Sequence, residues 1–160
     1  MAITADKIRY SRATNNRVDD VFAITTSNTV YVGALVNFVT STGRVASATA
    51  AASRNFAGVV EEIVNESGSA ITAATGNTSG TIKARISWGH EVLVNVKTAA
   101  RTFANVGRNL FVFDNDAVTD TTGAGTAAVR VKVGALSRFE ASDKSTGWIA
   151  LRVYGQADAT

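Results

Sequence analysis

Apolar and polar side chains alternate with a period of two over most of the chain after Val18. The clearest stretch covers 81–96, in which one face carries Ile82, Ala84, Ile86, Val92, Val94 and Val96, with Gly89 interrupting the pattern. Such alternation places successive side chains on opposite sides of the backbone and predicts β-strands rather than helices. We therefore expect 81–87 and 90–96 to form the best-defined strand pair of the protein.

Further β-rich runs recur at short intervals, separated by turn residues. They cover 18–25, 30–39, 56–64, 110–113, 129–139 and 148–154. We expect Gly33 to bend the second run, and we expect 46–55 to be either a loop or a short alanine-rich helix. About eight to ten short strands without strand–helix–strand alternation predict an all-β fold, a single compact β-sandwich or β-barrel-like domain.

Two segments break this pattern. Residues 65–80 are low in complexity and rich in Gly, Ser, Thr and Asn, which predicts a long, exposed hairpin loop. Residues 1–17 show neither helical nor strand periodicity. They fit a frayed terminus or an extended N-terminal arm, ahead of a β domain at 18–160.

The N-terminal arm is basic. It contains Lys7, Arg9, Arg12 and Arg17 against Asp6 alone, a formal charge of +3 that equals the excess of the whole chain. A basic extended segment can order on an acidic partner, which makes the arm a candidate binding element.

Composition narrows the function classes. The chain has 160 residues, one histidine, no cysteine and no proline, so disulfides, thiolate metal sites and cysteine nucleophiles are excluded. The first ten residues lack the apolar segment of a signal peptide, and no run approaches the roughly 18 apolar residues of a membrane span. We therefore expect a soluble protein made in a cytoplasm, with no membrane partner.

Catalytic patterns are weak. His90 is the one possible imidazole base, and no G-x-S-x-G motif accompanies it, so we interpret it as structural. Adjacent carboxylates occur at Glu61–Glu62 and at Asp19–Asp20. Neighbours on a strand point to opposite faces, so neither pair is expected to form an acid/base site. We predict no enzymatic activity and no cofactor.

Metal and nucleic-acid sites are not predicted either. Residues 114–116 (Asp-Asn-Asp) offer oxygen ligands but lack the Gly and Glu of a calcium loop, and an Asx-rich turn explains them. Basic residues alternate at Lys83 and Arg85, and again at Arg130 and Lys132. Without interleaved aromatic side chains, these faces fit solvated strands better than a nucleic-acid site.

The order of several short motifs resembles a known family. The motifs are YVGALV (31–36), TGRV (42–45), NFAGVVE (55–61), GRNLFVFD (107–114), DAV (116–118), VKVGAL (131–136) and GWIAL (147–151). In this succession they resemble the small β-rich capsid decoration (cement) proteins of tailed bacteriophages, over roughly 28–155. The segment 65–80 and the basic arm depart from the family pattern.

This resemblance implies a structural virion protein on the capsid exterior, which binds the major capsid protein and stabilises capsomer junctions. It also implies a homo-oligomer, with a trimer favoured. Within the arm, the candidate partner-binding residues are Lys7, Arg9, Tyr10, Arg12 and Arg17.

Two other binding functions stay open. One is a head-fibre or spike-like module that binds a receptor or glycan through 65–80 with Trp88 or Trp148. The other is a β-barrel that binds nucleic acid, which a steep salt dependence of binding would reveal.

Overall fold

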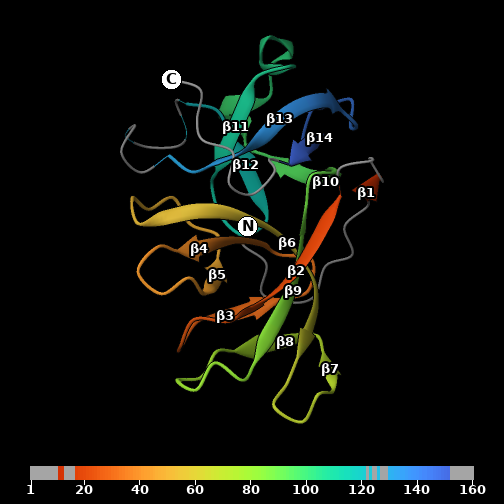
Figure 1. The fold of residues 1–160 in the computed structure, drawn as a ribbon. Coiled ribbons are helices and arrows are strands. Elements are labelled where there is room, and N and C mark those ends of the chain that lie inside the picture. Colours follow the sequence, from red (N-terminus) through yellow and green to blue (C-terminus); the bar gives the residue numbers. More distant parts are fainter. Residues whose placement is uncertain (1–10, 13–16, 122, 124–125, 127–129, 152–160) are drawn as a thin grey trace.

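The computed structural model describes residues 11–12, 17–121, 123, 126 and 130–151. Within these residues the protein is all-β, with strands β1–β14, two single-turn 3-10 helices and no α-helix. The all-β prediction is therefore confirmed. No helix in the described ranges is long and apolar enough to cross a membrane. The strands form an upper and a lower sheet, with a small third sheet at the lower end (Figure 1).

Five strands of the upper sheet close into a ring, which we call the upper barrel. Their order is β10 (Glu91–Val96), β12 (Ala117–Thr119), β11 (Asn109–Val112), β13 (Lys132–Phe139) and β14 (Thr146–Leu151). The ring closes because β14 also pairs with β10, placing Ile149 opposite Val92. The connection from β10 to β11 contains η1 (Thr98–Ala100) and η2 (Phe103–Asn105). Closure satisfies the edges that an open sheet would expose.

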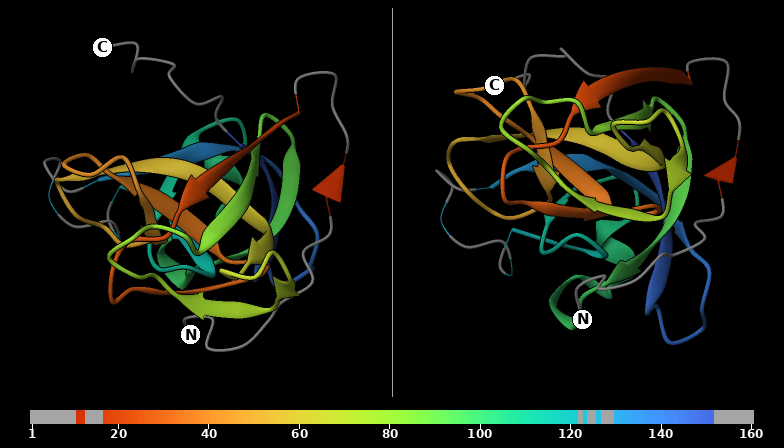
Figure 2. Two further views of the ribbon diagram at one scale, coloured as in Figure 1. Left: turned by 60° about the horizontal axis from the view of Figure 1, so that its bottom comes forward. Right: turned by 90° about the horizontal axis from the view of Figure 1, so that it is seen from below.

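The lower sheet has the order β2 (Val18–Ala23), β9 (Lys83–Trp88), β6 (Arg54–Val64), β4 (Leu35–Val39) and β5 (Val45–Ser47), with β7 (Ala70–Ile71) added to β6. A bridge between Ile24 and Val45 joins the two ends of this sheet at one point. There the Thr25 N–H donates to the Val45 carbonyl at 2.8 Å. Seen from below, the strands of the lower sheet curl into a ring (Figure 2).

β9 and β10 belong to different sheets, so the expectation that 81–87 and 90–96 pair with each other is wrong. β9 pairs with β2 and β6, whereas β10 pairs with strands of the upper barrel. The chain runs from one sheet into the other across Gly89, whose φ of 74° bends the strand. Two structures fit the alternation over 81–96: a continuous strand that bends, and a hairpin with a three-residue turn. In both of them Ile86 and Val92 lie on the same face of the strand. Alternation alone therefore does not distinguish them.

The core is divided into two clusters, one inside the upper barrel and one inside the lower sheet. Leu35 and Val59 pack in the upper cluster, while their chain neighbours Val36 and Val60 pack in the lower one. β4 and β6 are thus buried on both faces, although both are antiparallel strands. Burial on both faces explains why 30–39 and 56–64 read as nearly continuous apolar runs.

Segment 65–80 is more ordered than the predicted loop. It contains β7 and β8 (Ala73–Thr75), and β8 pairs with β3 (Thr29–Tyr31). The Arg44 guanidinium donates to the carbonyls of Asn77 and Thr78, each at 2.9 Å. Hydrogen bonds therefore tie this segment to the lower sheet, and Ile71 and Ala74 also pack against the lower core cluster. The alternative of a helix within 46–55 is also wrong, because β5, a loop and the start of β6 occupy it.

The described part of the N-terminal region lies along both sheets. β1 (Ser11–Arg12) pairs antiparallel with β10, and β2 pairs antiparallel with β9. Because β9 runs directly into β10, β1 and β2 follow the same bent strand from the upper sheet to the lower one. β1 lies at the outer edge of the fold in both views of Figure 2.

Candidate partner-binding site

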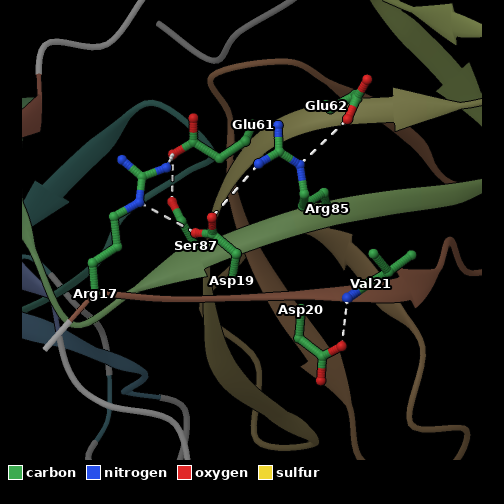
Figure 3. Close-up of polar contacts among 8 residues, drawn as sticks. All are labelled: Arg17, Asp19, Asp20, Val21, Glu61, Glu62, Arg85 and Ser87. Atoms are coloured by element: carbon green, nitrogen blue, oxygen red, sulfur yellow. Dashed lines mark hydrogen bonds and ion pairs between the residues drawn. The ribbon is translucent and has the colours of Figure 1, made fainter.

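A network of charged and polar side chains lies where β2, β9 and β6 of the lower sheet run side by side. We call it the outer polar cluster, and its members are Arg17, Asp19, Glu61, Glu62, Arg85 and Ser87 (Figure 3). The register brings them together, since Asp19 lies opposite Ser87 on β2–β9 and Glu62 lies opposite Arg85 on β6–β9.

Glu61 and Glu62 reach the same cluster, contrary to the expectation that they point to opposite faces. The pairing of β6 with β9 shifts between Val60 and Glu62, which makes Glu61 an extra residue in the strand. A β-bulge of this kind interrupts the alternation locally and re-aims a side chain. Asp19 and Asp20 do lie on opposite sides of β2, as predicted (Figure 3).

Ion pairs link the cluster in a chain. Arg17 lies 3.3 Å from a carboxylate oxygen of both Asp19 and Glu61. Arg85 lies 3.5 Å from Asp19 and 3.3 Å from Glu62. These side chains are 28–41% exposed, and solvent-screened pairs of this kind contribute at most about 1 kcal/mol each. The cluster fastens the N-terminal strand to β6, and its charges are engaged within the protein.

Ser87, His90 and Glu61 lie close together without forming a nucleophilic relay. The Ser87 hydroxyl donates to Glu61, and no hydrogen bond joins Ser87 to His90. Ser87 and His90 are 0% and 1% exposed, so a substrate has no access to them. A relay needs a serine bonded to the imidazole and open to substrate. The geometry therefore gives these residues a role in the fold.

His90 is buried at the bend between the two sheets. Burial, which penalises the charged imidazolium, lowers the pKa of His90, and the Arg17 cation acts in the same direction. The Trp88 backbone and the carboxylates of Glu61 and Asp19 oppose this shift but do not reverse it. His90 is therefore a neutral side chain at pH 7.

The Asp-Asn-Asp sequence at 114–116 forms the predicted Asx turn. Asp114 Oδ1 accepts hydrogen bonds from the N–H groups of Asp116 and Ala117, at 2.8 and 2.9 Å. Asp116 in turn accepts from the Asn95 side-chain amide at 2.7 Å. Among the described residues, no group of three or more His, Asp and Glu side chains gathers in a way that suits a metal ion.

The structure places only part of the predicted partner-binding set. Lys7, Arg9 and Tyr10 lie outside the described residues. Arg12 is in β1 opposite Glu91, and Arg17 belongs to the outer polar cluster. Arg17 thus binds within the chain, which leaves the more N-terminal residues of the arm as the candidates for contact with a partner.

The outer edge of β2 is poorly suited to pairing with an added strand. The Ile24 N–H donates to the Ile82 carbonyl. In this antiparallel pairing the backbone N–H groups of the even-numbered residues of β2 therefore point toward β9, and the Val21 N–H points away from the sheet. The Asp20 carboxylate accepts that N–H at 2.7 Å (Figure 3). A charged side chain that caps an outward N–H opposes pairing with another strand. β-augmentation at β2 is therefore disfavoured.

The two indoles do not form an exposed sugar platform. Trp88 is 5% exposed and packs in the lower cluster, where Phe22 lies 6.4 Å from it. Trp148 is 7% exposed, and its Nε1 donates to Glu140 at 2.6 Å. Stacking on a glycan needs an open ring face, so the structure lends no support to the receptor or glycan alternative through Trp88 or Trp148.

Exposed apolar side chains are a surface feature that the sequence did not reveal. Phe103 is 71% exposed, and Phe113 and Val106 are 45% and 41% exposed. Val18 and Val21 on β2 are 44% and 50% exposed. A lone phenylalanine in the connection 99–108 gave no periodic signal, and its exposure depends on how the connection folds.

Comparison with protein-family models, with curated proteins and with solved structures gives no match. The similarity to phage decoration proteins therefore rests on the motifs of the sequence, and the function is inferred from those motifs together with the geometry.

Proposed function

We propose that this chain is a structural protein of a tailed-phage virion, which binds the outer surface of the capsid and stabilises the junctions between capsomers. The order of motifs over roughly 28–155 motivates the proposal. The observation that carries it is the exposure of Phe103 and Val106, 71% and 41%, on backbone that is held in place by hydrogen bonds. Exposed apolar groups on a rigid frame suit binding to another protein surface.

The proposed partner is the major capsid protein, and the proposed oligomer is a homotrimer on the capsid exterior. A protein that binds the assembled shell but not its free subunits stabilises the shell by mass action. Several linked copies add avidity, because each further contact forms within an already bound complex. Light scattering of the purified chain measures the oligomer directly, and a mass equal to one chain would contradict the proposed homotrimer.

Binding to empty decoration sites is the first prediction. The purified chain is expected to co-sediment with expanded capsids that lack it and to raise the temperature at which those shells break open. At a free concentration of 100 times the Kd, each site gains about 2.7 kcal/mol of stabilisation. Sedimentation and a heat-stability assay of the shells measure the two effects. Unexpanded shells serve as the control, and absence of binding to expanded shells would contradict the proposal.

The arm gives a second prediction through its charge. Arg9→Glu is expected to weaken capsid binding about tenfold at low salt, with the difference shrinking as salt screens the charges. Lys83→Glu is the matched control, because it makes the same change of charge on an exposed position of β9. If the two variants occupied the capsid sites equally at every salt concentration, the arm would not be part of the binding surface.

A further inference from the structure

The two ends of the molecule differ in chemistry. At the lower end, the turns 65–69 and 76–80 consist of small and polar residues, with Glu66 as the one charged side chain (Figure 1). At the opposite end lies the segment 98–109, from η1 to the first residue of β11. It is next to the segment 138–146, which covers the end of β13, the turn after it and the first residue of β14. We call these two segments together the upper tip. It carries four cations and two carboxylates: Arg101, Arg108, Arg138 and Lys144 against Glu140 and Asp143.

Phe103 projects from the upper tip on a fixed backbone. The Val106 N–H donates to the Phe103 carbonyl at 3.1 Å, and the Gly107 N–H donates to Leu136 of β13 at 2.7 Å. The ring meets Phe139 edge-on at 5.8 Å, and Lys144 Nζ lies 4.4 Å from its centroid. It is nevertheless 71% exposed. The fold therefore presents an aromatic side chain that has little conformational freedom left to lose on binding.

Charge adds a second property to the upper tip. Glu140 is engaged by Trp148 and by Arg138, at 2.6 and 3.6 Å. The segment 98–109 contains two arginines and no carboxylate, so the region around Phe103 and Val106 has a net formal charge of +2 when the turn is included. An aromatic ring that contacts one cation, on a surface of net positive charge, complements an apolar pocket in an acidic surface.

We infer that the upper tip is a docking surface of this protein in addition to the arm, and that its partner is an acidic protein surface with an apolar pocket for the Phe103 ring. This inference rests on the proposed function, in which the acidic surface belongs to the capsid. An anionic membrane is the less suitable partner, because stable membrane binding takes two strong anchors. One phenylalanine, one valine and a net charge of +2 supply less than that.

The test compares two exposed phenylalanines, one in η2 and one directly after β11. Phe113 is 45% exposed and has Lys97 Nζ 4.2 Å from its ring, so it matches Phe103 in residue type and in its cation contact. It lies near the place where the upper barrel meets the lower sheet: in the turn that follows it, the Asn115 carbonyl accepts from the Leu35 N–H of β4 at 2.9 Å. Phe103→Ala is expected to weaken binding to expanded capsids about 30-fold or more, whereas Phe113→Ala leaves it unchanged.

Sedimentation with capsids and flotation with vesicles of phosphatidylcholine and phosphatidylserine give separable outcomes. Loss of capsid binding for Phe103→Ala alone supports the inference, provided that both variants melt as cooperatively as the wild type. Equal binding of wild type and Phe103→Ala overturns the docking surface but leaves the decoration function standing. If the wild type does not bind capsids at all, both the function and the inference fail, and vesicle flotation of the wild type but not of Phe103→Ala would assign the upper tip to a membrane.

Discussion

Gly58→Ala is expected to lower the free energy of unfolding by about 4 kcal/mol, because two costs coincide at this position. Gly58 has a φ of 146°, a backbone conformation that only glycine adopts without strain. A Cβ there would lie 2.8 Å from Ile86 Cγ2 and would also overlap the Ser87 carbonyl oxygen of β9. The neighbour is backbone on one side, so β6 and β9 must separate to make room.

Thermal unfolding measures the effect. A loss of this size lowers the Tm by about 8–16 °C in a protein of this length. Gly68→Ala is the matched control, since Gly68 has a φ of 81° with no atom within 4 Å of the added Cβ. That variant carries the backbone strain without the collision and is expected to cost about 1 kcal/mol. Equal Tm values for the two variants would show that β6 and β9 do not approach as closely as described.

Acidification is expected to destabilise the protein through His90. Its pKa in the folded state is lowered from the ordinary value of 6.5, chiefly by burial. As the pH falls through 6.5, the unfolded chain takes up a proton before the folded protein does, so the free energy of unfolding decreases. The contribution of His90 is complete above pH 6.5 and is lost as the pH falls toward the folded pKa. One proton limits the slope to about 1.4 kcal/mol per pH unit.

His90→Leu isolates this contribution, because His90 is the single histidine of the chain and leucine has a similar volume. Urea unfolding of both proteins between pH 8 and pH 5 gives the comparison. The variant is expected to be at least as stable at pH 8, since it replaces a buried polar ring by an apolar side chain of similar volume. It should also lose the acid slope. Parallel curves for the two proteins would show that His90 does not titrate at lower pH in the folded state.

A second titrating group acts outside this window. Hydrogen bonds from the side chain and backbone of Ser145 lower the pKa of Asp143 from 3.8. A carboxyl group with a lowered pKa stabilises the fold above its unfolded pKa and loses that contribution only at more acid pH. The difference between wild type and His90→Leu from pH 8 to pH 5 therefore reports on His90.

The sequence predicted individual strands better than it predicted their partners. The runs 18–25, 56–64 and 110–113 correspond to β2, β6 and β11 because alternation and turn residues are local properties. The pairing of 81–87 with 90–96 failed because Gly89 can either turn a hairpin or bend a continuous strand. Only the neighbours contributed by distant strands decide between these outcomes.

The candidate site was less accessible from the sequence. The prediction for Glu61 and Glu62 assumed regular alternation, and the bulge after Val60 depends on how β6 matches β9 across the sheet. Arg17 was assigned to a free arm, but its partners Asp19 and Glu61 come from two strands that only the folded sheet brings together. The exposure of Phe103 likewise depends on how the connection between β10 and β11, which contains η2, folds against the barrel.

By itself, the sequence determined that this protein is all-β, that glycine and small polar residues make its turns, and that its first 17 residues are basic. These features follow from side-chain alternation and composition, which act within a few residues. The tertiary structure alone decided that two cores form, that one strand runs through both sheets, and which charges pair. These depend on contacts between residues far apart in the chain, because burial and ion pairing are settled when the strands meet.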